Sequence, residues 1–213
     1  ILGSRFAGDA PPGVWEAAGR YCDIVTFNYY GRVDLLRAEA PGTAERWTEY
    51  YNKAKRPLMI TEWSFPALDS GLPCKHGAGM RVDTQTQKAL CYEVYQRMIF
   101  SLPFMVGSDY FMWVDEPALG ISDTFPEDSN YGLVNEQDEP YEELTRTATR
   151  VNTLAYALHS GKVPKVAVRQ VALRDGRVQA EVANTGPAPA AFDLVFTIDG
   201  RPQAPQRMQL APG

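Results

Sequence analysis

A short apolar run that ends abruptly in a carboxylate constrains the fold of this chain most. Residues 58–60 are Leu, Met and Ile without a polar interruption, and Glu62 and Trp63 come soon after them. An unbroken apolar run of this length is typical of a strand buried on both faces, as strands of parallel sheets are. Because functional side chains of parallel α/β proteins gather at the carboxyl ends of strands, Glu62 is a candidate catalytic residue. The alternative is a solvated residue that opens a loop.

The same form recurs along residues 1–160, with amphipathic segments between the apolar runs. Residues 23–30 are apolar and β-branched and finish in polar and aromatic groups, while residues 44–55 carry aromatic side chains at helical spacing. Strand–helix–strand crossovers belong to parallel sheets, so an α/β fold with four parallel strands is predicted. The expected strands are 1–6, 23–28, 57–62 and 104–113, and the expected helices are 14–21, 44–55, 84–101 and 139–160.

After residue 160 the pattern changes to short strands separated by turns. Residues 166–173, 178–182 and 192–198 show strand patterns, with Asp-Gly or Asn-Thr-Gly sequences between or after them. We therefore expect residues 1–160 to form one domain and residues 161–213 to form a small antiparallel β region of the sandwich type. About three strands bury too little surface to be stable alone, so this region is expected to be incomplete.

Composition argues against several classes of function. The 213 residues carry a net charge of −5 and a pI near 5.1, without a basic run, which argues against a nucleic-acid or membrane partner. A neutral ligand fits this charge better. The three cysteines, Cys22, Cys74 and Cys91, form no CxxC pair, and His76 and His159 are the only histidines. We therefore expect neither a disulfide framework nor a bound metal or other cofactor.

Two long loops follow predicted strand ends, at residues 66–82 and 114–137. Loops of this length without structure of their own are usually functional, so a role in shaping a substrate site is expected. The second loop is acidic, but the spacing of its acids does not match that of a calcium-binding EF-hand loop.

Five segments, taken in chain order, carry a family resemblance. They are residues 2–6, 23–30, 60–71, 107–113 and 130–134. Together they resemble the carboxyl-terminal half of clan A retaining β-glycoside hydrolases, with the β-agarase-like branch as the nearest match in that clan. The resemblance implies that the four strands are the fifth to eighth strands of a (β/α)8 TIM barrel. It also implies hydrolysis of β-glycosidic bonds in an agarose-like or other galactan polysaccharide.

The resemblance assigns Glu62 the role of catalytic nucleophile, since a carboxylate can form and then release a glycosyl ester. In the clan, the general acid/base follows the fourth strand, which would precede Ile1. Retaining hydrolysis needs the two carboxyl groups roughly 5–5.5 Å apart, so this chain by itself is expected to be inactive. We expect it to pair with a missing amino-terminal half of the barrel or with another copy, because unpaired sheet edges recruit partners.

The resemblance also implies roles for side chains at the other strand ends. Tyr30 resembles the tyrosine whose hydroxyl bonds the nucleophile. Tyr29 is the competing candidate, because alternation along a strand sends the two side chains to opposite sides. The alternative for both is a packing role. Trp113 resembles the aromatic platform under the sugar, with a core tryptophan as the alternative. The remaining candidates for substrate binding are Asn28, Trp63, Asp115 and Arg5, of which Arg5 could equally pair with a neighbouring carboxylate.

Three classes of function remain open at this point. The leading one is a retaining β-glycosidase, agarase-like or a β-galactosidase or β-glucanase of the same clan. The second is a carbohydrate-binding half-barrel without turnover, which predicts that the upstream strand lacks its glutamate. The third is a structural fragment that associates through its barrel edges.

Overall fold

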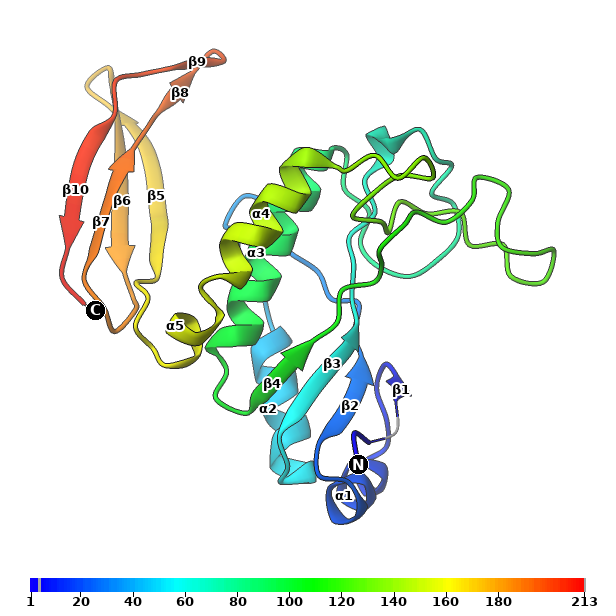
Figure 1. The fold of residues 1–213 in the computed structure, drawn as a ribbon. Coiled ribbons are helices and arrows are strands. Elements are labelled where there is room, and N and C mark those ends of the chain that lie inside the picture. The colour runs from blue at the N-terminus through cyan, green and yellow to red at the C-terminus, as the bar shows by residue number, and fades with distance from the viewer. Residues whose placement is uncertain (4, 213) are drawn as a thin grey trace. The chain divides into compact units, whose positions relative to one another are not determined.

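The computed structural model describes residues 1–3 and 5–212 of the chain. The chain divides into two compact units, Ile1–Ala155 and Tyr156–Gly213, each of which is described by itself. The first unit is built on a four-stranded sheet in the order β1-β2-β3-β4, and each neighbouring pair runs parallel (Figure 1). The prediction of a parallel sheet with strands in chain order is therefore confirmed.

The four strands are short, and their register places the candidate residues at one end of the sheet. They are β1 (Phe6–Ala7), β2 (Val25–Asn28), β3 (Leu58–Glu62) and β4 (Met105–Ser108). Asn28 on β2 is the register partner of Glu62 on β3, so both stand at the carboxyl edge. Leu58 and Ile60 are fully buried, as the unbroken apolar run predicts.

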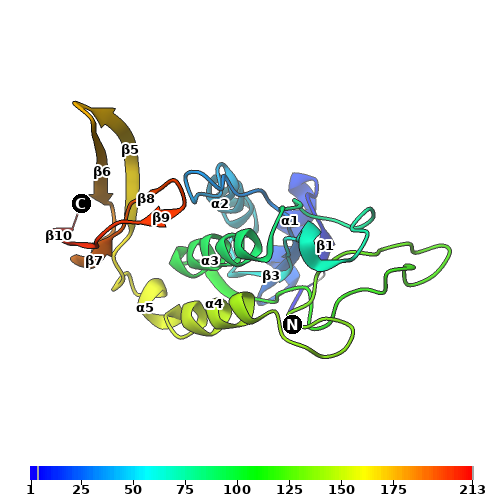
Figure 2. The ribbon, with the colours of Figure 1, turned by 90° about the horizontal axis from the view of Figure 1, so that it is seen from above.

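The helices that connect the strands lie where the sequence pattern predicts them. They are α1 (Pro12–Tyr21), α2 (Thr43–Ala54) and α3 (Gln85–Ser101). Proline is tolerated in the first turn of α1, and the Thr84 hydroxyl caps α3 by accepting a 3.2 Å hydrogen bond from the Gln87 backbone amide. Helices α2 and α3 lie on the same face of the sheet (Figures 1 and 2).

Aromatic side chains fill the space between the sheet and these helices. The rings of Trp15 and Tyr50 stack at 4.1 Å, and Phe27 meets Trp47 edge-on at 5.8 Å. All four side chains are almost completely buried, so this cluster supplies much of the apolar area that stabilises the unit.

Two predicted elements differ from the structure at their ends. Strand β4 stops at Ser108 rather than at residue 113, although the Phe111 amide still bonds the Trp63 carbonyl at 3.0 Å. From Met112 onward the backbone instead pairs with residues 131–134, which return from the loop. The predicted helix 139–160 is two helices, α4 (Glu142–Asn152) and α5 (Ala155–His159). It breaks where the Thr153 hydroxyl bonds the Arg150 carbonyl at 2.8 Å, in competition with the helical backbone pattern.

The second unit is made of antiparallel pairs. Strands β5 (Val166–Arg174) and β6 (Arg177–Asn184) form a hairpin whose turn residues, Asp175 and Gly176, have φ of 51° and 70°. Two left-handed residues are what a two-residue hairpin turn requires. The predicted strand at 192–198 is divided between β7 (Ala190–Leu194), paired with β10 (Gln206–Leu210), and β8 (Thr197–Ile198), paired with β9 (Arg201–Pro202).

Within the described residues, no helix is both long enough and apolar enough to cross a membrane.

Candidate functional site

Glu62 stands at the carboxyl end of β3 with a partner on each carboxylate oxygen. Arg5, just before β1, donates to Oε1 at 2.5 Å, and the Tyr30 hydroxyl, just after β2, donates to Oε2 at 3.1 Å. Three segments that are far apart in sequence therefore meet at one carboxylate. The Glu62 side chain remains 19% exposed, which leaves it accessible to a ligand.

The structure places the two neighbouring tyrosines on different sides, as alternation requires. The Tyr29 ring packs edge-on against Trp47 at 5.7 Å, on the helix side of the sheet. The next residue, Tyr30, turns toward Glu62. Of the two candidates, Tyr30 is therefore the one in contact with the carboxylate.

The electrostatic environment keeps the Tyr30 hydroxyl protonated. Burial first, and then the negative charge of Glu62, raise the pKa of Tyr30 well above its usual range. A protonated hydroxyl can only donate to a carboxylate, as that of Tyr30 does to Glu62 Oε2. The Arg5 guanidinium adds a positive charge on the other oxygen, although its side chain is 58% exposed and solvent screens it.

Asn28 lies beside this pair but is itself almost fully buried. Its Oδ1 accepts a 2.9 Å hydrogen bond from the Thr61 hydroxyl on the neighbouring strand. The amide is therefore fixed across the β2–β3 pair at the carboxyl edge, next to Glu62.

Trp63 was predicted to line the same pocket, and the structure places it in the core instead. The side chain is fully buried, its indole N–H donates to the Ser108 hydroxyl at 2.7 Å, and its ring packs against Tyr92 and Tyr95. Trp63 joins the same core cluster as Ile60, although strict alternation would place it on the opposite face, and a register shift in the β2–β3 pair lies just before it. This position corrects the predicted contact with substrate.

Trp113 and Asp115 lie on the segment that follows β4, in different surroundings. The Trp113 side chain is 67% exposed, and its carbonyl accepts hydrogen bonds from the amides of Leu133 and Val134. Among the described residues, no hydrogen bond or ring contact joins Trp113 to Glu62. Its ring is available to a ligand, but the predicted convergence with the carboxylate is not a direct contact.

Asp115 was predicted to bind substrate, but its side chain is buried and saturated by the protein. It accepts from the Asn130 side-chain amide at 2.9 and 3.0 Å, from the Gly132 backbone amide at 2.7 Å and from the Tyr141 hydroxyl at 2.5 Å. A carboxylate that accepts four hydrogen bonds from three donors is held in place as a structural acceptor. We therefore correct its role from substrate binding to holding the loop.

Tyr131 belongs to the site, although sequence reasoning gave it no role. Its ring lies 6.4 Å from that of Tyr30 and 5.2 Å from that of Phe111, and its hydroxyl donates to the Ala78 carbonyl at 2.9 Å. Tyr131 thus ties both long loops to the tyrosine that contacts Glu62. The only sequence signal for Tyr131 was its place in the 130–134 segment. The residue pattern of a long loop does not predict the path of its backbone.

A pair of glutamates from the second loop lies near these tyrosines. Burial first, and then a hydrogen bond to the half-buried Glu127, raise the pKa of Glu116 to about 8. The Oε1 atom of Glu116 meets no other protein donor among the described residues. The Glu116 carboxyl group therefore holds its proton at neutral pH, and the charge of Glu127 contributes to raising the pKa of both Tyr30 and Tyr131.

Residues 75–76 of the first long loop contact Asp128 of the second. Both the Lys75 and His76 amides donate to Asp128 Oδ1, at 2.9 and 2.8 Å, and His76 Nδ1 lies 3.5 Å from Asp128 Oδ2. In the described part of the chain, no group of three or more His, Cys, Asp or Glu side chains could hold a metal ion.

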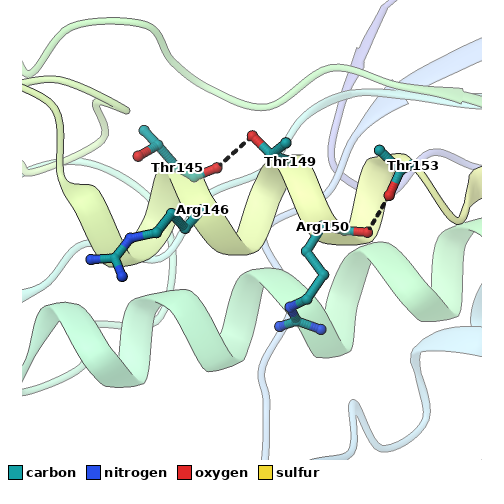
Figure 3. Close-up of a pocket in the computed structure, with 5 residues that line it drawn as sticks. All are labelled: Thr145, Arg146, Thr149, Arg150 and Thr153. Atoms are coloured by element: carbon teal, nitrogen blue, oxygen red, sulfur yellow. Dashed lines mark hydrogen bonds between the residues drawn. The ribbon is translucent and has the colours of Figure 1, made fainter.

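A shallow pocket lies on helix α4, on a different element from the Glu62 cluster (Figure 3). Its threonine hydroxyls bond back to the helix, as Thr149 does to the Thr145 carbonyl at 2.9 Å. Its Arg150 is engaged with Glu93 on α3 by two hydrogen bonds, at 2.8 and 2.6 Å. These hydroxyl and guanidinium groups already bond to α3 and α4, so we assign this pocket no catalytic role.

Comparison with known proteins relates the chain to agarases. No protein-family model matches it. The curated β-agarase B of Vibrio sp. (strain JT0107) is 30% identical over 162 residues, which make up 76% of this chain and 16% of that protein. The crystal structure of an agarase is 30% identical, with a TM-score of 0.60 over 70% of this chain and 21% of that one. The structure of an exo-β-agarase is 27% identical, with a TM-score of 0.59 over 70% and 18% of the two chains.

These likenesses support an agarase-like relationship among the glycoside hydrolases. They fall on about three quarters of this chain and on less than a quarter of each relative.

Proposed function

We propose that this chain is part of a retaining β-glycoside hydrolase that acts on an agarose-like or other galactan polysaccharide, with Glu62 as its nucleophile. The observation that carries the proposal is the Glu62 carboxylate at the end of a parallel strand, held by Arg5 and Tyr30. Relatives named as β-agarases, at about 30% identity, give the substrate class. Enzyme sites of parallel α/β folds lie at this end of the strands.

The four parallel strands are the fifth to eighth strands of a (β/α)8 barrel in this proposal. The strand order supports it, since β1 to β4 follow one another in sequence and in the sheet, as consecutive barrel strands do. The other strands and the general acid/base come from outside residues 1–213. Glu116 and Glu127 do not replace the acid/base, because they follow the last strand rather than the fourth.

The geometry suits the formation and release of a glycosyl ester. Arg5 and Tyr30 each donate to one oxygen of Glu62, so they fix the orientation of its carboxylate for attack on the anomeric carbon. Attack by Glu62 expels the leaving oxygen, which the acid/base protonates, and water then releases the sugar with the configuration retained. The exposed ring of Trp113 offers a flat apolar face to the C–H groups of a pyranose.

Covalent trapping in the complete enzyme tests this function. A 2-deoxy-2-fluoro-galactoside with a good leaving group should esterify the nucleophile and release it slowly, because fluorine destabilises the transition states of both steps. Mass spectrometry of the digest should find the fluorosugar on the peptide that carries Glu62, and Glu62→Gln should abolish the label. A label on another carboxylate, or no label in an enzyme that hydrolyses the parent glycan, would overturn the assignment.

A further inference from the structure

A lysine ammonium is buried within the first unit, between helix α3 and the segment that carries Tyr131. The Lys88 side chain is 1% exposed, and its Nζ donates to the Asn130 carbonyl at 2.8 Å, to Asn130 Oδ1 at 2.9 Å and to the Gly132 carbonyl at 3.0 Å. Three acceptors match the three N–H bonds of an ammonium group. A buried charge is tolerated only with such partners, so each of these bonds matters to the placement of residues 130–132.

Asn130, fully buried, is the centre of this network. Its Oδ1 also accepts from the Gln85 side chain at 3.0 Å and from the Ala67 amide at 3.1 Å, while its Nδ2 donates to Asp115. One side chain thus joins α3, the segment after β3 and the segment after β4. We call Lys88, Asn130 and Asp115 the buried hub.

The buried hub fixes the backbone on both sides of Tyr131. On one side is Asn130, and on the other the Gly132 amide donates to Asp115 while its carbonyl accepts from Lys88. A Cβ at Gly132 would lie 2.1 Å from the Val134 carbonyl oxygen, so the backbone packs too closely there for any other residue. Tyr131 has little freedom to move without breaking the hub.

We propose that Lys88 is a positioning residue for the Glu62 site, acting through the buried hub on Tyr131 and through Tyr131 on Tyr30. The Tyr131 ring lies against Tyr30, whose hydroxyl bonds Glu62, so the chain of contacts is continuous from Lys88 to the carboxylate. Lys88 touches neither Glu62 nor a substrate. The inference rests on the proposed function, since it assigns Lys88 a part in the same reaction.

The physical consequence of losing Lys88 is a looser Tyr30. Without the ammonium, the two carbonyls and the Asn130 amide oxygen lose a charged donor, and residues 130–132 can shift. Tyr30 then loses the ring that backs it, and its hydrogen bond to Glu62 weakens. A carboxylate that loses a hydrogen-bond donor is less acidic.

The pH dependence of kcat/KM in the complete enzyme tests the proposal. Its acid limb reports the protonation of the nucleophile in the free enzyme. Lys88→Met should move this limb to higher pH, as Tyr30→Phe should, and the exposed-lysine control Lys162→Met should leave it in place. Lys88 is charged across the acid limb, because burial lowers its pKa only to about 7.

A double-mutant cycle separates positioning from a general loss of stability. If Lys88 acts through Tyr30, then Lys88→Met should add no further shift in a Tyr30→Phe background. An unmoved acid limb in folded Lys88→Met, or shifts that add in the double variant, would overturn the proposal. Thermal unfolding of each variant shows whether it is folded at the assay temperature.

Tyr131→Leu provides the second variant if Lys88→Met does not fold. It removes the ring against Tyr30 and keeps the backbone contacts of the buried hub, so it should shift the acid limb in the same direction. An unchanged acid limb in this folded variant contradicts the proposal.

The activity of Glu62→Gln separates failure of the proposed function from failure of the positioning role. If Glu62→Gln retains normal activity, the proposed function itself fails. If Glu62→Gln is inactive while the acid limb does not move in folded Lys88→Met, only the positioning role of Lys88 fails.

Discussion

At the scale of single residues, the contacts of Glu62 divide the predicted candidates into two groups. Arg5 and Tyr30 touch its carboxylate, and Asn28 lies beside it in the sheet register. Trp63 and Asp115 are buried among protein partners instead. The burial of Trp63 could not be predicted by alternation from the buried Ile60, because the strand register shifts between the two residues. The donors around Asp115 could not be predicted, because they come from the loop and from the start of α4.

Tyr30→Phe removes the donor to Glu62 while keeping the ring. A hydrogen bond to a charged group contributes about 1.5–3 kcal/mol, so kcat/KM of the complete enzyme should fall roughly 10- to 100-fold with little change in unfolding temperature. The matched control is Tyr29→Phe, whose ring packs on the helix side and whose loss of a hydroxyl should leave the rate near normal. Equal losses in the two variants would contradict the assignment of Tyr30.

Glu116 gives the free energy of unfolding a predictable pH dependence. Because its pKa is raised from 4.5 to about 8, the folded chain holds a proton that the unfolded chain releases between these pH values. The stability from this group is fully present below pH 4.5 and is lost as the pH rises through 8.

Glu116→Gln should remove that dependence, since the amide stays neutral. We expect the difference in unfolding free energy between the variant and the native chain to grow in favour of the variant from pH 5 to pH 9, by about 1–3 kcal/mol. Denaturant unfolding at several pH values measures it. A difference that stays constant with pH would contradict the raised pKa of Glu116.

At the scale of elements, the packing of α1 on α2 depends on one glycine. A Cβ at Gly19 would lie 1.8 Å from the Ala54 carbonyl oxygen at the end of α2. Gly19→Ala should therefore destabilise the unit by about 1–3 kcal/mol or more, although alanine is the better helix former. Gly13→Ala, in the same helix with open space around it, is the control and should leave stability unchanged or slightly raised. Chemical denaturation that ranks the two variants the other way would contradict this packing.

Most elements could be predicted because local pattern determines them. The apolar run of β3, the aromatic spacing of α2 and the Thr84 cap of α3 are all readable in the sequence. The end of β4 was misplaced because residues 112–113 pair with residues 131–134, some twenty positions later. The break between α4 and α5 depends on a threonine side chain that bonds its own helix, which apolar periodicity does not reveal.

At the scale of the whole molecule, the edge strands β1 and β4 of the parallel sheet have no outer partner among the described residues, and Val106 on β4 is 52% exposed. Unpaired edges and uncovered apolar surface recruit partners, so residues 1–213 expressed alone should associate with another copy. Sedimentation velocity measures this association. A stable, monodisperse monomer would contradict the half-barrel interpretation.

The most direct test of the account is azide rescue of Glu62→Ala in the complete enzyme. The change removes the group that attacks the anomeric carbon and leaves room for a small anion, with little loss of fold at a strand end. Turnover of an activated glycoside should collapse, and azide should restore part of it as a glycosyl azide of inverted anomeric configuration, because one displacement replaces two. Glu116→Gln, the control, should keep the native product. Near-normal activity of Glu62→Ala, or hydrolysis with inversion by the intact enzyme, would show that Glu62 is not the nucleophile.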